Sequence, residues 1–316
     1  MSSASSGPPV LDRRSALRGI ATLTAGLAVS SCGSGDRPPV RLAAGEPGGF
    51  FWEFSGLLAA AADRAGAARL EPLRTGGSAE NLEMLRSGRA DLAMSLSDTA
   101  QDHPAAADLT AVGRVYENYF QVAVRHDSTV TSPRELAGRV VSVGAPGSGA
   151  TTLSERVLAA AGLPGRDAVR RVRQPMRDAA AALGAGTVDA VMWAGGLPTP
   201  ALAEAAVDLR LLDLAAAVDA LRQTYGTIYE PVSVPANVYG RHPAVITLGV
   251  ANLLLASRDL ADPVVAAMVD LLLDDPSALV PAQAIGSQFL DAQSLIQTGT
   301  IALHPGAAAE YRRRHG

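Results

Sequence analysis

The chain has 316 residues, 48% of them hydrophobic, and a formal net charge of −4, so it is long enough for one large domain or for two lobes of ordinary size. All 27 Lys or Arg positions hold arginine, and no basic block is interleaved with aromatic residues, which argues against a nucleic-acid partner. The single cysteine excludes an internal disulfide bond and a metal site built from cysteines.

The first 32 residues have the pattern of an export signal and are left out of the expected fold. Arg13-Arg14 resembles a twin-arginine signal, and the apolar run 20–29 is too short to cross about 30 Å of hydrocarbon as a helix. Small residues precede Cys32 as in a bacterial lipobox, so Cys32 is the expected lipid attachment point. Residues 33–39 are an expected tether. We therefore expect an exported protein, anchored to the outside of the cell membrane by a lipid.

One stretch of the remaining chain occurs twice. Residues 40–49 and 139–148 each have the pattern of a buried strand that runs into a G-x-P-G loop, and the two loops are 99 residues apart. Later in each copy a helix end, a glycine (Gly88 and Gly186, 98 apart) and a further strand also repeat. Two motifs kept in register predict two similar α/β lobes, and the Gly-rich loops of facing lobes would line a cleft suited to a small anion.

Each lobe is expected to alternate strands with helices. In the first lobe the expected strands are 40–44, 69–74 and 91–96, and the expected helices are 50–65 and one from its N-cap Ser78 to Gly88. In the second lobe the expected strands are 140–143, 169–173 and 189–193, and the expected helices are 150–161 and 177–185. This alternation predicts parallel sheets covered on both faces, with ligands bound beyond the carboxyl ends of the strands.

Two extended segments, 120–125 and about 245–254, are expected to cross between the lobes. Residues 40–122 and 245–316 would then form lobe 1, and residues 123–244 would form lobe 2. A hinge of two strands would let the lobes close on a ligand. After the second crossing the expected helices are 263–273, about 277–297, and a terminal helix whose solvated end carries the run 312–314.

The loop at residues 144–151 is the leading candidate for an anion site. It follows a strand and opens a helix, so successive backbone N–H groups can point at an anion, and Ser148 and Thr151 add hydroxyl donors. It is not a dinucleotide fingerprint, because Thr152 stands where the third glycine belongs, and it is not a P-loop, because no lysine follows. A tight turn without a ligand is the alternative, but we favour a carboxylate site.

Several other candidates have a structural alternative. Ser78 is expected to cap a helix whether or not a ligand is bound. For Asn81 the alternatives are a position facing the cleft and one facing solvent, and for Asp98 they are binding of a ligand amino group and capping of a turn. The aromatic residues 50–52 stack on a ligand or belong to the core. The complete set of expected ligand-binding residues is Gly49, Phe50, Phe51, Gly77, Ser78, Asn81, Ser97, Asp98, Tyr119, Ser148, Gly149, Thr151, Trp193, Gly195 and Tyr239.

The chemistry that an enzyme needs is not visible in the sequence. None of the five histidines stands in metal-ligand spacing with another, and His304 taken alone is more often structural than catalytic. Ser148 does not match the G-x-S-x-G motif of the hydrolase nucleophile turn, because Pro146 occupies the position that requires glycine. We expect no catalytic residue, metal or cofactor, and keep a hydrolase as a remote alternative.

These residues together resemble the TAXI family, the extracytoplasmic solute receptors of one class of TRAP transporters. The resemblance covers nearly all the mature chain and is carried, in order, by residues 48–49, 75–82, 88–93, 97–98, 116–117, 135–144, 147–149, 186–190, Pro235 with Tyr239, and 303–307. It implies a periplasmic-binding-protein type II fold and binding without chemistry, and we expect the protein to be a monomer. It also implies that a small organic anion, typically glutamate or a related dicarboxylate, is delivered to a TRAP-type permease.

The chain departs from the family pattern in three places. Residues 50–52 (Phe-Phe-Trp) replace a small hydroxyl residue and tyrosine, which suggests a more apolar substrate end. The family's Ser-Gly-Thr becomes Ser-Gly-Ala-Thr at residues 148–151, which shifts the hydroxyl, and the segment after Asp98 is short. A different function on the same fold is a ligand sensor that signals to a membrane kinase.

Overall fold

The computed structural model describes residues 38–165, 167–281 and 290–315. Arg13-Arg14, Cys32 and most of the expected tether lie outside the described residues, so export and lipid attachment stay predictions. Within the described ranges, no helix is both long and apolar enough to cross a membrane.

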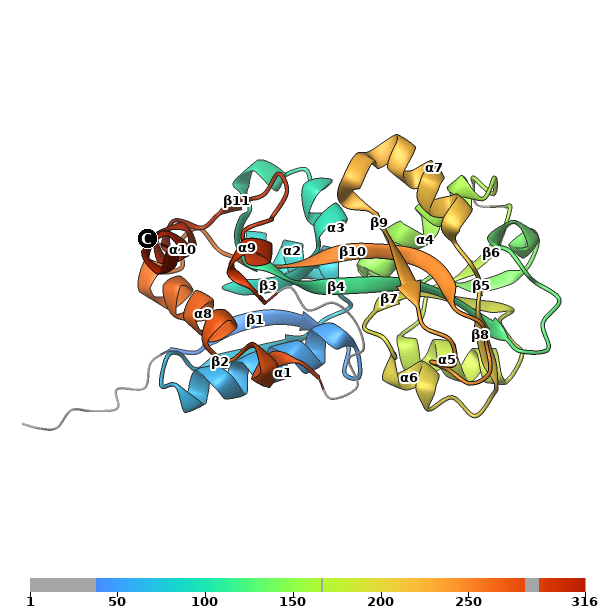
Figure 1. The fold of residues 1–316 in the computed structure, drawn as a ribbon, viewed down its shortest axis with the longest axis horizontal. Helices are drawn as coiled ribbons and strands as arrows, with labels where there is room; N and C mark the ends of the chain where they lie inside the picture. Colours follow the sequence, from blue (N-terminus) through green and yellow to red (C-terminus); the bar gives the residue numbers. More distant parts are fainter. Residues whose placement is uncertain (1–37, 166, 282–289, 316) are drawn as a thin grey trace, which may run out of the picture. The chain divides into compact units, whose positions relative to one another are not determined.

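The first lobe is built on a mixed sheet whose strands follow the order β2-β1-β3-β10-β4 (Figure 1). The strands of this half are β1 (Val40–Gly45), β2 (Leu70–Arg74), β3 (Leu92–Leu96), β4 (Thr110–Arg125), β10 (Val245–Ala256) and β11 (Ala302–Leu303). β1, β2 and β3 are parallel, whereas β10 runs antiparallel to both β3 and β4. The helices of this lobe are α1 (Phe50–Arg64), α2 (Ser78–Arg86), α3 (Ser97–Gln101), α8 (Asp262–Asp274), α9 (Ala292–Leu295) and α10 (Pro305–His315).

Both faces of this half-sheet are buried. Leu92 and Leu254 belong to the core that includes α1, α8 and α10, while their neighbours Ala93 and Leu253 belong to the core that includes α2 and α3. Because successive side chains of a strand point to opposite faces, these runs of apolar residues are what a sheet covered on both sides requires.

The second lobe repeats the arrangement around β7, with β5 parallel to both β7 and β6. Its strands are β5 (Val140–Ser142), β6 (Arg170–Val172), β7 (Ala190–Gly195), β8 (Leu209–Leu211) and β9 (Glu230–Val234). Its helices are α4 (Gly149–Ala160), α5 (Met176–Gly184), α6 (Pro200–Ala203) and α7 (Ala215–Tyr225). α4 and α7 contribute to one core, and α5 and α6 contribute to a separate one.

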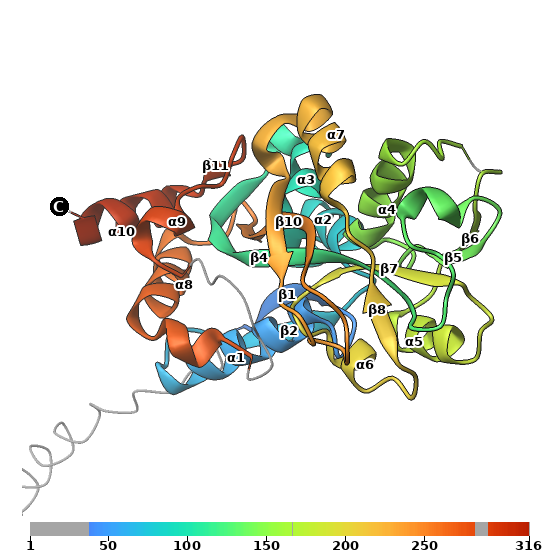
Figure 2. The ribbon, with the colours of Figure 1, turned by 45° about the vertical axis from the view of Figure 1, so that its right-hand side comes forward.

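β4 and β10 are long strands that belong to both lobes (Figures 1 and 2). β4 pairs with β10 over residues 110–120 and with β7 over residues 119–124. β10 pairs with β3 through residues 252–256 and with β9 through residues 245–249. The two segments expected to cross between the lobes are therefore parts of these strands, although β4 begins ten residues earlier than expected.

Two expectations about helices are wrong. Residues 277–297 do not form one helix: a 3-10 turn ends at Leu279, Val280 is extended, and α9 begins only after its N-cap Asp291. The physical reason is Pro281, because a residue that precedes proline is disfavoured in the α region. Ser78 is not the N-cap of α2, since that position is Gly77, and Ser78 Oγ accepts instead from the backbone N–H of Leu96 at 3.0 Å.

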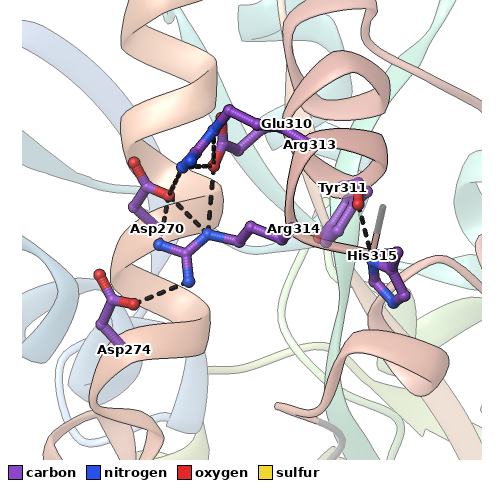
Figure 3. A network of polar contacts seen from close by, with 7 residues as sticks. All are labelled: Asp270, Asp274, Glu310, Tyr311, Arg313, Arg314 and His315. Carbon is purple, nitrogen blue, oxygen red and sulfur yellow. Dashed lines mark hydrogen bonds and ion pairs between the residues drawn. The ribbon is translucent and has the colours of Figure 1, made fainter.

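The arginine run near the C-terminus does more than end a helix in solvent. Arg314 Nε donates to Asp270 of α8 at 2.8 Å, Nη1 donates to Asp274 at 2.8 Å, and Nε also contacts Glu310 at 3.1 Å (Figure 3). Arg313 donates to both oxygens of Glu310 at 3.0 and 2.9 Å. These charges join α10 to α8, so the terminal helix is fixed by a network of ion pairs.

We expect Arg314→Ala to lower the free energy of unfolding by about 1 kcal/mol, the upper end for partly exposed pairs, because it removes three carboxylate contacts at once. Urea denaturation should show the loss at low salt and a smaller loss at 1 M salt, where screening is strong. Arg312→Ala is the matched control and should leave the midpoint unchanged. An equal effect of the two substitutions would contradict the network.

Candidate ligand-binding cleft

A cavity lies between the lobes, at the carboxyl ends of β1, β3 and β7. It encloses about 420 Å³ of space between atoms, part of which is open to solvent. Its walls are Gly45, Glu46, Gly49, Phe50, Phe51, Gly76, Gly77, Ser78, Leu96, Asn118, Ser148, Gly149, Ala150, Trp193, Ala194 and Gly195.

Two helix N-termini, one from each lobe, reach this cavity. α1 begins at Phe50 after its N-cap Gly49, which has no side chain, and α4 begins at Gly149 after Ser148, whose side chain does not cap the helix. The first N–H groups of a helix have no partner within the helix, and the described residues supply no acceptor to those of Gly149 and Ala150. Together with the helix dipoles, these groups make the cavity attractive to a negatively charged ligand.

The N-terminus of α2 is already occupied. The carbonyl oxygen of Gly147, in the second lobe, accepts from the N–H groups of Ala79 and Glu80 at 3.0 and 3.2 Å. A peptide carbonyl from one lobe thus takes the place that an anion would take at this helix of the other lobe. The segment Gly76–Asn81, which includes the start of α2, therefore contributes to closure of the lobes more directly than to ligand binding.

Glycines allow the lobes to meet at backbone distance. A Cβ on Gly76 would overlap the carbonyl oxygen of Pro146, and a Cβ on Gly149 would lie 2.8 Å from Ser78 Oγ. A Cβ on Gly196 would overlap the ring of Phe50. The structure is therefore a closed arrangement in which side chains at these positions would push the lobes apart.

Glu46 connects the two lobes across the cavity. It lies in the loop between β1 and α1, and its Oε2 accepts from the backbone N–H of Met176, the first residue of α5, at 2.9 Å. Its Oε1 is buried and has no hydrogen-bond partner within the described residues. Burial raises the pKa of Glu46, and the Met176 N–H opposes this shift.

Two further cavity residues carry buried polar atoms without a hydrogen-bond partner in the described part of the chain. They are Asn118 Oδ1 and Trp193 Nε1. The amide nitrogen of Asn118 is used, since it donates to Asn252 Oδ1 on β10 at 2.8 Å. With Glu46 Oε1, the residues of the cavity wall carry two such acceptors and one such donor. Such atoms are costly to bury unless a ligand or water bonds them.

The structure brings nine of the expected ligand-binding residues together in the cavity wall. They are Gly49, Phe50, Phe51, Gly77, Ser78, Ser148, Gly149, Trp193 and Gly195. Phe50 is also a core residue, in edge contact with Tyr116 at a centroid distance of 4.5 Å. Phe51 and Trp193 are the aromatic walls, from the first and second lobe respectively.

The other expected residues lie outside this wall. Asn81 is buried and donates to the carbonyl oxygens of Ala44 and Met94 at 2.7 and 2.8 Å, which ties β1 to β3. Thr151 Oγ1 donates to the Ala145 carbonyl at 3.0 Å. Tyr239, whose pKa is raised by burial to about 12, donates to Gln121 Oε1 at 2.5 Å.

Three more expected residues are also elsewhere. Tyr119 is buried in the core around α5. Ser97 lines a separate hollow on the other face of β4, together with Glu117. Asp98 is completely buried at the junction of the lobes and does not face the cavity.

Asp98 is part of an interlobe clamp centred on Arg156 of α4. Arg156 contacts Asp98 Oδ2 at 3.5 Å, makes short hydrogen bonds to the Tyr229 hydroxyl and to Asp102, and stacks 4.2 Å from the ring centroid of Tyr225. Tyr229 in turn donates to Asp98 Oδ2 at 2.9 Å. Burial raises the pKa of Asp98, and the charge of Arg156 opposes this shift.

Sequence reasoning missed Glu46, Asn118 and Arg156. A usable signal existed for Glu46, because it is an acid in a Gly-rich loop at the carboxyl end of a strand. Arg156 gave none, since an arginine in mid-helix is usually a solvated side chain. Within the described ranges, no group of three or more His, Cys, Asp or Glu side chains is placed to hold a metal ion.

Two α/β lobes, two shared strands and an interlobe cavity define the periplasmic-binding-protein type II fold, and the fold expected from the sequence is confirmed. A protein from Bordetella bronchiseptica RB50 matches with TM-score 0.55 at 14% identity, over 88% of this chain and 98% of that one. A putative L-cystine ABC transporter from Listeria monocytogenes matches with TM-score 0.53 at 12% identity, over 79% and 99%. More particularly, the chain belongs to the NMT1-like family, whose model matches residues 42–313.

Proposed function

We propose that the protein is an extracytoplasmic solute-binding receptor that closes its two lobes on a small organic anion of the glutamate or related carboxylate class. The observation that carries the proposal is the meeting of the α1 and α4 N-termini, from opposite lobes, at one cavity. A carboxylate that accepts from both would hold the lobes together, as a bivalent ligand does.

The delivery step is inferred from family membership and from the resemblance to TAXI receptors. In this proposal the protein hands its ligand to a TRAP-type permease and acts as a monomer, held to the membrane by a lipid on Cys32. Export by the twin-arginine route belongs to the same proposal.

We infer binding without chemistry. No histidine, cysteine or arginine is among the described cavity-wall residues, and Glu46 is the sole ionisable side chain there. A hydrolase would need a base beside a nucleophile, and Ser148 Oγ has instead Thr151 Oγ1 as its neighbour, at 3.2 Å.

A thermal-shift screen of the purified protein against amino acids and mono- and dicarboxylates tests the proposal. A ligand present at 100 times its dissociation constant should add about 2.7 kcal/mol to the free energy of unfolding. Calorimetry should confirm the hit, and the ligand should be recovered unchanged. Ligand carried over from the host would hide a shift, so the denatured protein is also analysed by mass spectrometry. The proposal fails if neither experiment yields an organic anion.

A further inference from the structure

We propose that Glu46 is a ligand-binding residue that recognises a hydrogen-bond donor, an ammonium or hydroxyl group, carried by the anion beside its carboxylate. The inference rests on the proposed function and adds a requirement on the ligand that the helix N-termini alone would not impose. It starts from the buried, unpartnered Oε1 of a residue that lines the cavity.

The charges around the cavity favour such a ligand. Glu46 is the one ionisable side chain among the described wall residues, and it is an acid. Beyond the wall, the charge of Arg74 lowers the pKa of Glu46 and that of Asp178 raises it. A plain dicarboxylate would bring negative charge toward Glu46 with no cation between them. An ammonium or hydroxyl group on the ligand replaces this repulsion by a charge-assisted hydrogen bond.

The bridging position of Glu46 links this recognition to closure. Its Oε2 already accepts from the Met176 N–H at the start of α5, in the opposite lobe. A donor on the ligand would satisfy Oε1 only when this bridge is made, because the bridge fixes the carboxylate in the cavity wall. Asn118 Oδ1, the other unpartnered acceptor among the wall residues, belongs to the hinge strand β4 and can accept a second hydrogen bond from an ammonium group. The Glu46 carboxylate would thereby contact both the donor group of the ligand, through Oε1, and the opposite lobe, through Oε2.

A matched pair of ligands and a matched pair of variants test the inference. L-glutamate and glutarate differ by the amino group alone, and 2-hydroxyglutarate carries a hydroxyl in its place. Glu46→Gln keeps the size of the side chain and can still accept from Met176 through its amide oxygen, but it then offers N–H groups to the ligand. Glu53→Gln, on the exposed side of α1, is the control for loss of one negative charge. Isothermal calorimetry of each protein with each ligand gives the complete set of dissociation constants.

The wild-type protein should bind glutamate at least about tenfold more tightly than glutarate, the effect expected of one hydrogen bond to a charged group. Glu46→Gln should erase this preference while it keeps glutarate binding, which also shows that the variant is folded, and Glu53→Gln should retain the preference. The inference is overturned, with the proposed function intact, if both ligands bind and the ratio of their affinities is the same in Glu46→Gln. If no carboxylate binds the wild-type protein, the proposed function fails and the inference fails with it.

Discussion

Gly76→Ala is expected to weaken ligand binding by about a hundredfold, which corresponds to roughly 2.7 kcal/mol. In the closed structure a Cβ at this position overlaps the carbonyl oxygen of Pro146, which belongs to the opposite lobe. A backbone atom cannot move aside as the end of a flexible side chain can. The φ angle of Gly76 is not in the left-handed region, so alanine fits the lobe that carries it. The substitution should therefore act against closure, and lower affinity by reducing the closed population.

Gly56→Ala is the matched control, because it adds the same methyl group in the same lobe. A Cβ on Gly56 meets nothing within 4 Å, and the residue lies inside α1. Replacing glycine by alanine there should stabilise the protein by about 0.5–1 kcal/mol and leave affinity unchanged. Small-angle scattering should show Gly76→Ala as more open than the wild type in the presence of ligand. Wild-type affinity together with an unchanged radius of gyration would show that this closed contact is not part of the bound state.

The architecture could be predicted from the sequence because it rests on local, repeated signals. The G-x-P-G loops, the glycines that end helices and the apolar strands each determine their own element, and their spacing shows that the set occurs twice. The strand of residues 110–119 was missed because its buried residues Glu117 and Asn118 interrupt the apolar pattern. Glu117 pairs with its near neighbour Arg114, whereas Asn118 donates to Asn252, a partner 134 residues away that a sequence window does not contain.

The candidate site could be predicted only at the level of loops. Gly-rich turns at strand ends led to nine residues of the cavity wall, since that placement follows from the topology of parallel sheets. The role of each individual residue could not be predicted in this way. Asn81 and Asp98 are polar residues near strand ends and helix starts, where ligand contacts were expected. Asn81 instead donates to the Ala44 carbonyl, and Asp98 accepts from the Tyr229 hydroxyl. Which polar group lines a cleft and which one is bonded within the protein depends on contacts between segments that are distant in the sequence, and these have no signature in the local sequence.

Arg156→Ala is expected to destabilise the protein by about 3 kcal/mol at pH 7, with a fall in melting temperature of roughly 5–10 °C. Arg156 is the cation beside Asp98, whose side chain is fully buried, and removing one member of a buried pair leaves an uncompensated charge. Arg86→Ala is the control, because Arg86 makes an exposed pair with Glu83 and such pairs contribute little. A double-mutant cycle with Asp98→Asn separates the pair from the other contacts of Arg156.

The pH dependence of this loss distinguishes the charge of Asp98 from lost packing. Burial already holds the pKa of Asp98 above its ordinary value, and without Arg156 it should rise further. A raised carboxyl pKa means that the folded state binds more protons than the unfolded state above the ordinary Asp pKa, so stability falls as the pH rises. The deficit of Arg156→Ala relative to wild type should therefore be small near pH 4 and grow toward pH 7. A deficit that is constant over this range would assign the effect to lost contacts with Tyr225 and Tyr229, and would remove Asp98 from the clamp.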